Sequence, residues 1–177
     1  MMLMLLRTLA PVALLVCSSG VVQLAADTVA MPTTQAQSLS GHEVTLPAAV
    51  AGHQAVIVIG FSHGSQKAME RWDKEIGAQV TAKPGIPLYN VAVIQDAPKF
   101  VRGMITHGMR ALVPTAGQDR FLTVVEGQDE LKKAVDFSKG DEAYVVILDA
   151  AGKIVFHTHG DPSETAKKQI VDQLKDK

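Results

Sequence analysis

The sequence predicts an α/β fold in which a mixed β-sheet carries helices on both faces. An unbroken apolar run at residues 55–61 has the length of a buried strand, and an amphipathic segment follows it. Farther on, two apolar runs at 143–148 and 153–158 flank the turn Asp149-Ala150-Ala151-Gly152, a pattern typical of a β-hairpin. Strands that alternate with helical segments indicate the α/β class.

Apolar spacing places the helices. A first helix is expected from about Ser65 to Val80, because Met69, Trp72 and Ile76 recur along one helical face. Pro98 begins a second helix that ends before Pro114. Its apolar positions are Val101, Met104, Ile105, Met109 and Leu112.

The remaining elements complete a four-stranded sheet. A strand is expected at 88–94, a short extra N-terminal strand at 44–46 and a short helix around 129–135. Asp161 and Pro162 predict the cap and first position of the last helix. Strands joined by a helical crossover are parallel and those of a hairpin are antiparallel, so the predicted sheet is mixed.

Three segments are expected along the 177 residues. Residues 1–26 read as a signal peptide with one arginine and an apolar stretch, which predicts a periplasmic or secreted protein. The alternatives are an uncleaved N-terminal anchor and a lipoprotein modified at Cys17. Residues 27–40 are polar and read as a flexible linker, and residues 41–177 form the domain.

Composition excludes some partners. The net charge is −1 and the sequence has no run of Lys or Arg, so nucleic acid is not an expected partner. A membrane is expected to be contacted only through the leader, if the leader is retained. The expected partner is a protein client in the cell envelope.

The order of elements resembles the thioredoxin-like fold, but without its chemistry. In that fold the turn after the first buried strand carries two redox cysteines, whereas Gln66 and Met69 stand near those positions here. The only cysteine of the chain is Cys17, in the leader. Thiol–disulfide exchange and peroxide reduction need a thiolate, so the chain is expected to be redox-inactive and not an enzyme.

Three motifs also resemble one branch of this superfamily. They are Phe61-Ser62-x-Gly64 with Trp72 eight residues later, Arg120-Phe121-Leu122, and Asp149-x-x-Gly152-x-Ile154. In their order, over roughly residues 40–175, they resemble the cysteine-less mitochondrial ATP synthase assembly factors. The resemblance implies a chaperone for a membrane-embedded ATP synthase subunit. The predicted signal peptide does not resemble a mitochondrial transit peptide.

The turn that replaces the redox motif is the predicted binding site. Ser62, His63, Gly64, Ser65 and Gln66 offer hydroxyls and free N–H groups at a helix N-terminus, which suit an anion or carboxylate. In the alternative interpretation, Ser62 or Ser65 caps the helix and Gly64 relieves the turn. A Ser62–His63 nucleophile is not favoured, since adjacent side chains diverge.

A second function is predicted from histidines. His157 and His159 are two residues apart on a strand and share one face, which would let two imidazoles bind one ion. Asp161, His63 or His107 could supply a further ligand. Two hypotheses therefore remain: a binding or assembly module without a cofactor, and a metal-binding protein that takes zinc or copper. For the first, the helix from Pro98 to Leu112 is an alternative binding face.

Overall fold

One eight-stranded sheet organises the protein in the computed structural model, which describes residues 29–174. The strands run in the order β1-β8-β7-β4-β5-β6-β2-β3. Their bounds are β1 Val29–Ala30, β2 Thr34–Ser38, β3 Glu43–Leu46, β4 Ala55–Gly60, β5 Leu88–Val93, β6 Phe121–Val124, β7 Ala143–Leu148 and β8 Lys153–His159. The helices are α1 Gln66–Thr81, α2 Lys99–Leu112, α3 Gln128–Ala134 and α4 Glu164–Gln173.

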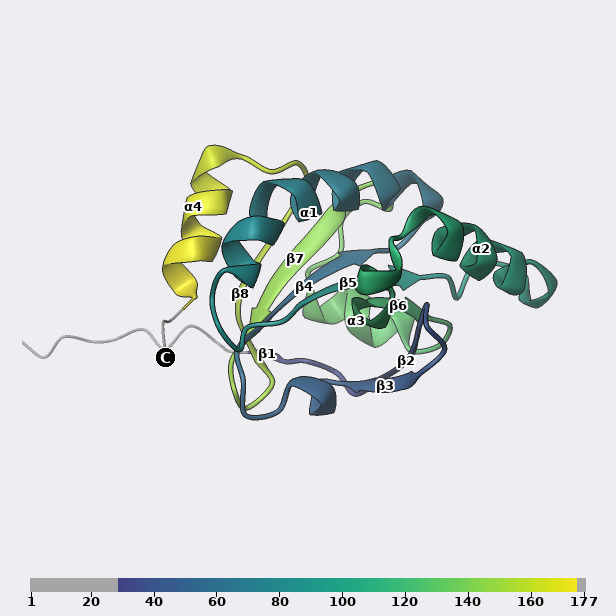
Figure 1. Ribbon diagram of the computed structural model, residues 1–177, viewed down its shortest axis with the longest axis horizontal. Coiled ribbons are helices and arrows are strands. Elements are labelled where there is room, and N and C mark those ends of the chain that lie inside the picture. The colour runs from purple at the N-terminus through teal and green to yellow at the C-terminus, as the bar shows by residue number, and fades with distance from the viewer. Residues whose placement is uncertain (1–28, 175–177) are drawn as a thin grey trace, which may run out of the picture.

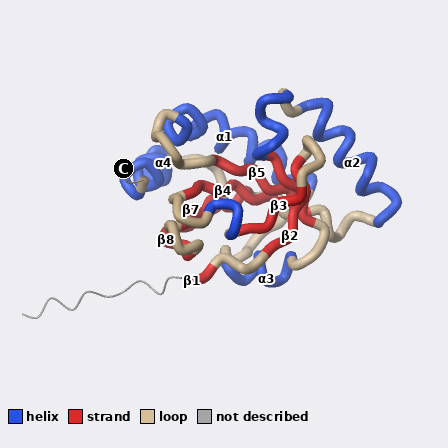
Figure 2. Tube along the Cα trace, turned by 60° about the horizontal axis from the view of Figure 1, so that its bottom comes forward, coloured by secondary structure: helices blue, strands red, loops and turns tan. Residues whose placement is uncertain are grey.

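Helices cover both faces of the sheet, as predicted (Figure 1). On one face, α1 and α4 pack on alternate residues of β4 and β7 through Trp72, Ile76 and Ile170, which are all 0% exposed. On the other face, Leu131 of α3 packs on Ile57 and Ile59 of β4. Figure 2 shows the strands as one curved layer between these helices. Both faces of β4 and β7 are therefore core, which explains why their sequences are continuously apolar.

The sheet has eight strands and not the four that were predicted. The four predicted strands form its centre, in the order β8-β7-β4-β5, with β4 parallel to β5 and antiparallel to β7. Beyond β5, the strand β6 adds in parallel and the hairpin β2–β3 adds in antiparallel orientation. The two-residue strand β1 pairs with β8 at the opposite edge.

The prediction of a flexible linker at residues 27–40 was wrong over the part that the structure describes. Residues 29–30 and 34–38 are strands of the sheet. In β2 the residues Thr34, Ala36 and Ser38 are buried and alternate with exposed glutamines. This is a period-two pattern without large apolar residues, and for that reason the sequence alone does not reveal it. The predicted leader, residues 1–26, lies outside the described residues.

The cap of α4 differs from the sequence expectation. The cap of α4 is Ser163, whose hydroxyl accepts from the N–H of Ala166 at 3.1 Å, and not Asp161. Asp161 instead pairs with Arg71 of α1. At the other end of the sheet, α2 has no fully buried residue. Of its predicted apolar positions, Val101, Ile105 and Met109 are half-buried against the domain, whereas Met104 and Leu112 are exposed.

Candidate functional site

Two serine hydroxyls close the turn that follows β4. The Ser62 hydroxyl accepts from the Gly64 N–H at 3.0 Å and donates to the carbonyl of Gly140 at 2.6 Å. The Ser65 hydroxyl donates back to the carbonyl of Ser62 at 2.7 Å, and Ser65 is 0% exposed. The capping interpretation is confirmed for Ser62, which caps the short 3-10 turn His63–Ser65 that leads into α1. At the N-cap of α1 itself, Ser65 makes no side-chain cap bond. Because both hydroxyls hold the backbone of the turn, neither is arranged as a nucleophile.

The turn is also packed tightly on both sides. At Gly60, the last residue of β4, a Cβ atom would collide with the sulfur of Met69 and the hydroxyl of Ser65. At Gly64 a Cβ atom would lie 3.3 Å from the Cβ of Asp141. The turn thus lies between the first turn of α1 and the loop that enters β7. Gly60 has no room for a side chain, and at Gly64 a side chain would require Asp141 to shift slightly.

Neither residue near the expected cysteine positions can do thiol chemistry. The Gln66 amide donates to a carboxylate oxygen of Glu70 at 2.9 Å, one helical turn farther along α1. Met69 is 6% exposed and belongs to the core beneath α1. Residues 29–174 contain no cysteine. The geometry of a strand, a turn and a helix remains, but the described part of the chain supplies no thiolate.

The five predicted binding residues lie together in this turn, but they are not equally available. Ser65 is buried and cannot contact a partner. Ser62, His63 and Gly64 are exposed, and Gln66 is half-buried. Within residues 29–174 the His63 ring makes no hydrogen bond or ion pair. We call the exposed surface of Ser62, His63, Gly64 and Gln66 the rim.

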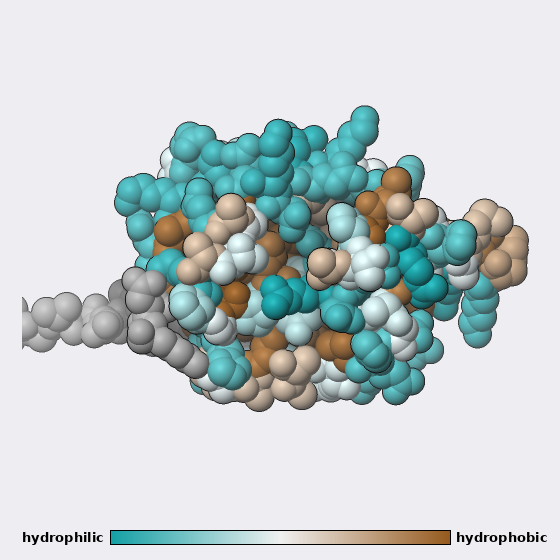
Figure 3. Space-filling view, in the orientation of Figure 1, coloured by the Kyte–Doolittle hydropathy of each residue, from teal (hydrophilic) through white to brown (hydrophobic). Residues whose placement is uncertain are grey.

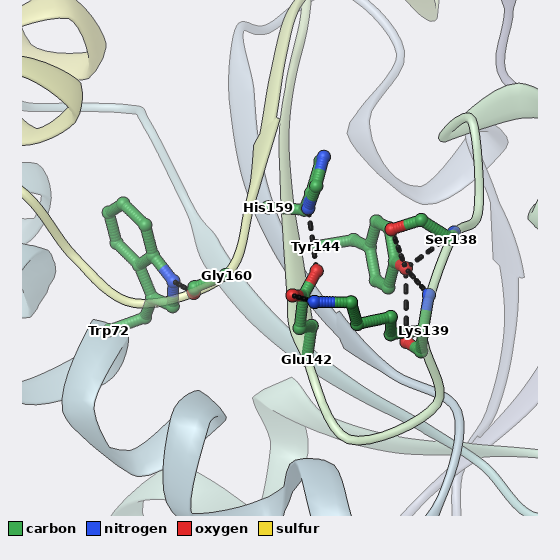
Figure 4. A network of polar contacts seen from close by, with 7 residues as sticks. All are labelled: Trp72, Ser138, Lys139, Glu142, Tyr144, His159 and Gly160. Atoms are coloured by element: carbon green, nitrogen blue, oxygen red, sulfur yellow. Dashed lines mark hydrogen bonds and ion pairs between the residues drawn. The ribbon is translucent and has the colours of Figure 1, made fainter.

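A buried tyrosine that the sequence analysis did not single out supports the turn from behind (Figure 4). The Tyr144 hydroxyl accepts from the N–H groups of Ser138 and Lys139 at 2.8 and 2.9 Å. It donates to the carbonyl of Lys139 at 3.0 Å. These bonds fix the loop whose Gly140 carbonyl receives the Ser62 hydroxyl. Tyr144 is 1% exposed, and its position in an apolar strand gives no sequence signal for this role.

The same network includes one of the two predicted metal ligands. The Nδ1–H of His159 donates to Glu142 at 2.7 Å, and Lys139 lies 3.3 Å from the other oxygen of that carboxylate (Figure 4). The hydrogen bond from His159, reinforced by Lys139, holds the pKa of Glu142 below its usual value against the opposing effect of burial. The His159 ring also stacks on Tyr144 with 5.5 Å between centroids.

The other predicted ligand has a different partner. His157 Nε2 lies 3.6 Å from a carboxylate oxygen of Asp136. The candidate third ligands lie elsewhere: Asp161 pairs with Arg71, and His107 lines a groove beside α2. Among residues 29–174, no three His, Cys, Asp or Glu side chains come together as a metal site. Binding of zinc or copper by the pair stays a prediction.

A groove of about 680 Å³ separates α2 from the β2–β3 hairpin. Most of the residues that line it are polar, among them Arg102, Thr106 and Arg110 from α2 and Gln35, Gln37 and Glu43 from the hairpin. The Arg110 Nε–H donates to the carbonyl of Leu39 at 2.6 Å. Arg102 donates to the carbonyls of Gln95 and Ala97 at 2.7 and 2.9 Å. Two arginines thus hold α2 to the domain through backbone carbonyls.

Solved structures with the same architecture include exported and assembly-related proteins. The pneumococcal exposed lipoprotein thioredoxin Etrx1 from Streptococcus pneumoniae has a TM-score of 0.59 at 11% identity, covering 81% of this chain and 100% of its own. BsSco, a member of the Sco family of cytochrome c oxidase assembly proteins, has a TM-score of 0.53 at 13% identity, covering 82% and 91%. A peroxiredoxin-like protein from Aquifex aeolicus has a TM-score of 0.55 at 14% identity, covering 84% and 86%. These similarities establish the thioredoxin-like fold.

The sequence comparison identifies the family. No curated protein matches the chain, but the family described as ATP10 protein matches residues 24–176. Members of this family are mitochondrial ATP synthase assembly factors, and the expectation of a periplasmic or secreted protein is therefore wrong. The family match agrees with the motifs of the turn and the hairpin and with the absence of a cysteine from residues 29–174. This chain belongs to the ATP10 protein family, a cysteine-less branch of the thioredoxin-like superfamily whose members are assembly modules.

Proposed function

We propose that this protein promotes ATP synthase assembly by holding an unassembled subunit at the rim of the turn, without any thiol chemistry. The observation that carries the proposal is the turn itself. Its geometry is kept by the hydrogen bonds of Ser62 and Ser65, while His63 and Gly64 stay exposed. The client that the family's role suggests is a membrane-embedded subunit of the enzyme.

Rigidity of the rim supports a binding role. The turn is fixed internally by the capping box of Ser62 and Ser65, to β4 by the close approach at Gly60, and to the loop before β7 through Gly140. A partner that binds a fixed surface does not lose free energy in ordering it. The exposed His63 ring can donate or accept a hydrogen bond, and it makes none to residues 29–174.

Capture of a newly made client tests this proposal. The membrane-embedded ATP synthase subunits would be synthesised in vitro with the full chain present and recovered by pull-down. His63→Ala with Gln66→Ala should lower recovery of one subunit severalfold, while Lys153→Ala, an exposed change on β8, should not. All variants should unfold within about 0.5 kcal/mol of the wild type, because exposed side chains contribute little to stability. Equal recovery by the rim variant and the wild type would contradict the proposal.

A further inference from the structure

Helix α2 exposes the apolar side chains that a core helix would bury. Phe100 is 87% exposed, Met104 73% and Leu112 72%. By contrast, α1 buries Trp72 and Ile76 completely. Figure 1 shows α2 projecting at one end of the long axis, and Figure 3 shows apolar residues at the surface of that end. A single exposed apolar side chain needs no explanation, but three on one short helix indicate an interaction surface.

The charge of α2 is also unlike that of the other helices. It contains Lys99, Arg102 and Arg110 and no acidic residue, and none occurs between Pro98 and Gln118. The helices α1, α3 and α4 each carry as many acidic as basic residues. Since the whole chain has a net charge of −1, the rest of it has −1 − 3 = −4. The helix α2 is thus positively charged, whereas the rest of the chain has a net negative charge.

The attachment of α2 sets its orientation. Arg102 and Arg110 donate to backbone carbonyls of the domain, so these two side chains are directed toward it, whereas Lys99 on the first turn of the helix is exposed. Phe100 and Met104, four residues apart, lie on the side that points away. Neither guanidinium group forms an ion pair with residues 29–174, although Glu43 lines the same groove, and both groups lie within a helix diameter of the exposed side chains. At moderate ionic strength, such charges still attract an anionic surface that lies about 10 Å away.

These properties together identify the partner. Two copies of α2 packed together would bring like charges into contact. A basic helix with exposed Phe and Met on its outer side and an exposed Leu at its end is suited to lie in the surface of an anionic bilayer. None of the helices formed by residues 29–174 is both long and apolar enough to cross one.

We infer that α2 docks the domain on an anionic membrane surface, with Phe100, Met104 and Leu112 in the headgroup region. This surface is distinct from the rim, and the inference does not depend on the proposed client. The sequence analysis expected membrane contact only through the leader, because the basic residues form no run. Lys99, Arg102 and Arg110 come to one side only through helical spacing.

Fluorescence of an indole placed in α2 tests the inference in the full chain. Phe100→Trp puts a reporter at the exposed site, while the only native tryptophan, Trp72, is buried. With phosphatidylcholine vesicles containing phosphatidylglycerol, emission of the new indole should shift to the blue and be quenched by brominated lipid. Pure phosphatidylcholine should give a much smaller response. Lys67→Trp on α1, also exposed, is the position control and should give no shift even if the leader binds lipid.

Charge variants in the Phe100→Trp background measure the electrostatic contribution. Lys99→Gln should raise the lipid concentration at half-response about fivefold, the effect of about 1 kcal/mol per basic residue. Lys67→Gln removes the same charge from α1 and should change it little. The inference is overturned if the indole shows no shift with anionic vesicles, or if both charge variants weaken binding equally. If the indole of Phe100→Trp shows no shift and the separate variant Phe100→Ser loses client capture, α2 binds a protein partner instead of a membrane.

Discussion

A methyl group added at Gly60 should destabilise the protein strongly, because it would enter the closed space between β4 and α1. The new Cβ atom would collide with the Met69 sulfur and the Ser65 hydroxyl and would lie 3.2 Å from the Met69 Cγ. Neither neighbour can move aside easily: Ser65 is 0% and Met69 6% exposed. Overpacking of this kind costs about 1–3 kcal/mol, and two collisions place Gly60→Ala at about 2–3 kcal/mol.

The same substitution on α2 is a matched control with the opposite sign. A Cβ atom at Gly103 would meet nothing within 4 Å, and the residue lies inside the helix. Alanine is a better helix former than glycine, so Gly103→Ala should stabilise by up to about 1 kcal/mol. Urea unfolding followed by the fluorescence of Trp72, the only tryptophan of the chain, measures both variants. If Gly60→Ala unfolds within 0.5 kcal/mol of the wild type, about the range of a harmless surface change, the tight packing of the turn is refuted.

Three further outcomes follow from the network behind the turn. Tyr144→Phe should cost about 2–3 kcal/mol, since it removes the partner of two N–H groups and one carbonyl; hydrogen exchange of the Ser138 and Lys139 amides should accelerate, and unchanged protection would contradict the network. Glu142→Gln should lower stability at neutral pH. Because the pKa of Glu142 is lowered from 4.5, the difference from the wild type should be full above that pH and disappear as pH falls through the lowered pKa, whereas a constant difference would contradict the role of the carboxylate. If His157 and His159 bind Zn²⁺ together, each must leave its own carboxylate partner, and excess Zn²⁺ should raise the melting temperature in a way that His157→Ala abolishes; no rise with the wild type would contradict the metal site.

The elements with a strong apolar pattern could be predicted from the sequence. The bounds of α1, β4 and β7 agree with the prediction within a residue or two, because their pattern and their burial have the same cause. β2 could not be predicted, because Thr34, Ala36 and Ser38 are small or polar and become buried only when β3 and β6 pair beside them. The sequence of a strand does not show which neighbouring strands will pair with it and bury it.

The site shows the same division between local and long-range information. The residues of the turn are consecutive, so the candidate site could be located from the sequence. The contact of Ser62 with Gly140 joins residues 78 positions apart, and the sequence gives no indication of it. In α2 the apolar spacing predicted a helix correctly, but such spacing identifies a face without showing what covers it.

Assembly without thiol chemistry is the central claim, and one replacement tests it most directly. Cys17→Ser removes the only cysteine of the chain. The amount of assembled ATP synthase would be measured on native gels, in cells that lack this protein and express either the variant or the wild type. We predict equal amounts of assembled enzyme, because the rim contains no sulfur. Loss of assembly with Cys17→Ser, when the variant is present at the wild-type level, would contradict the claim.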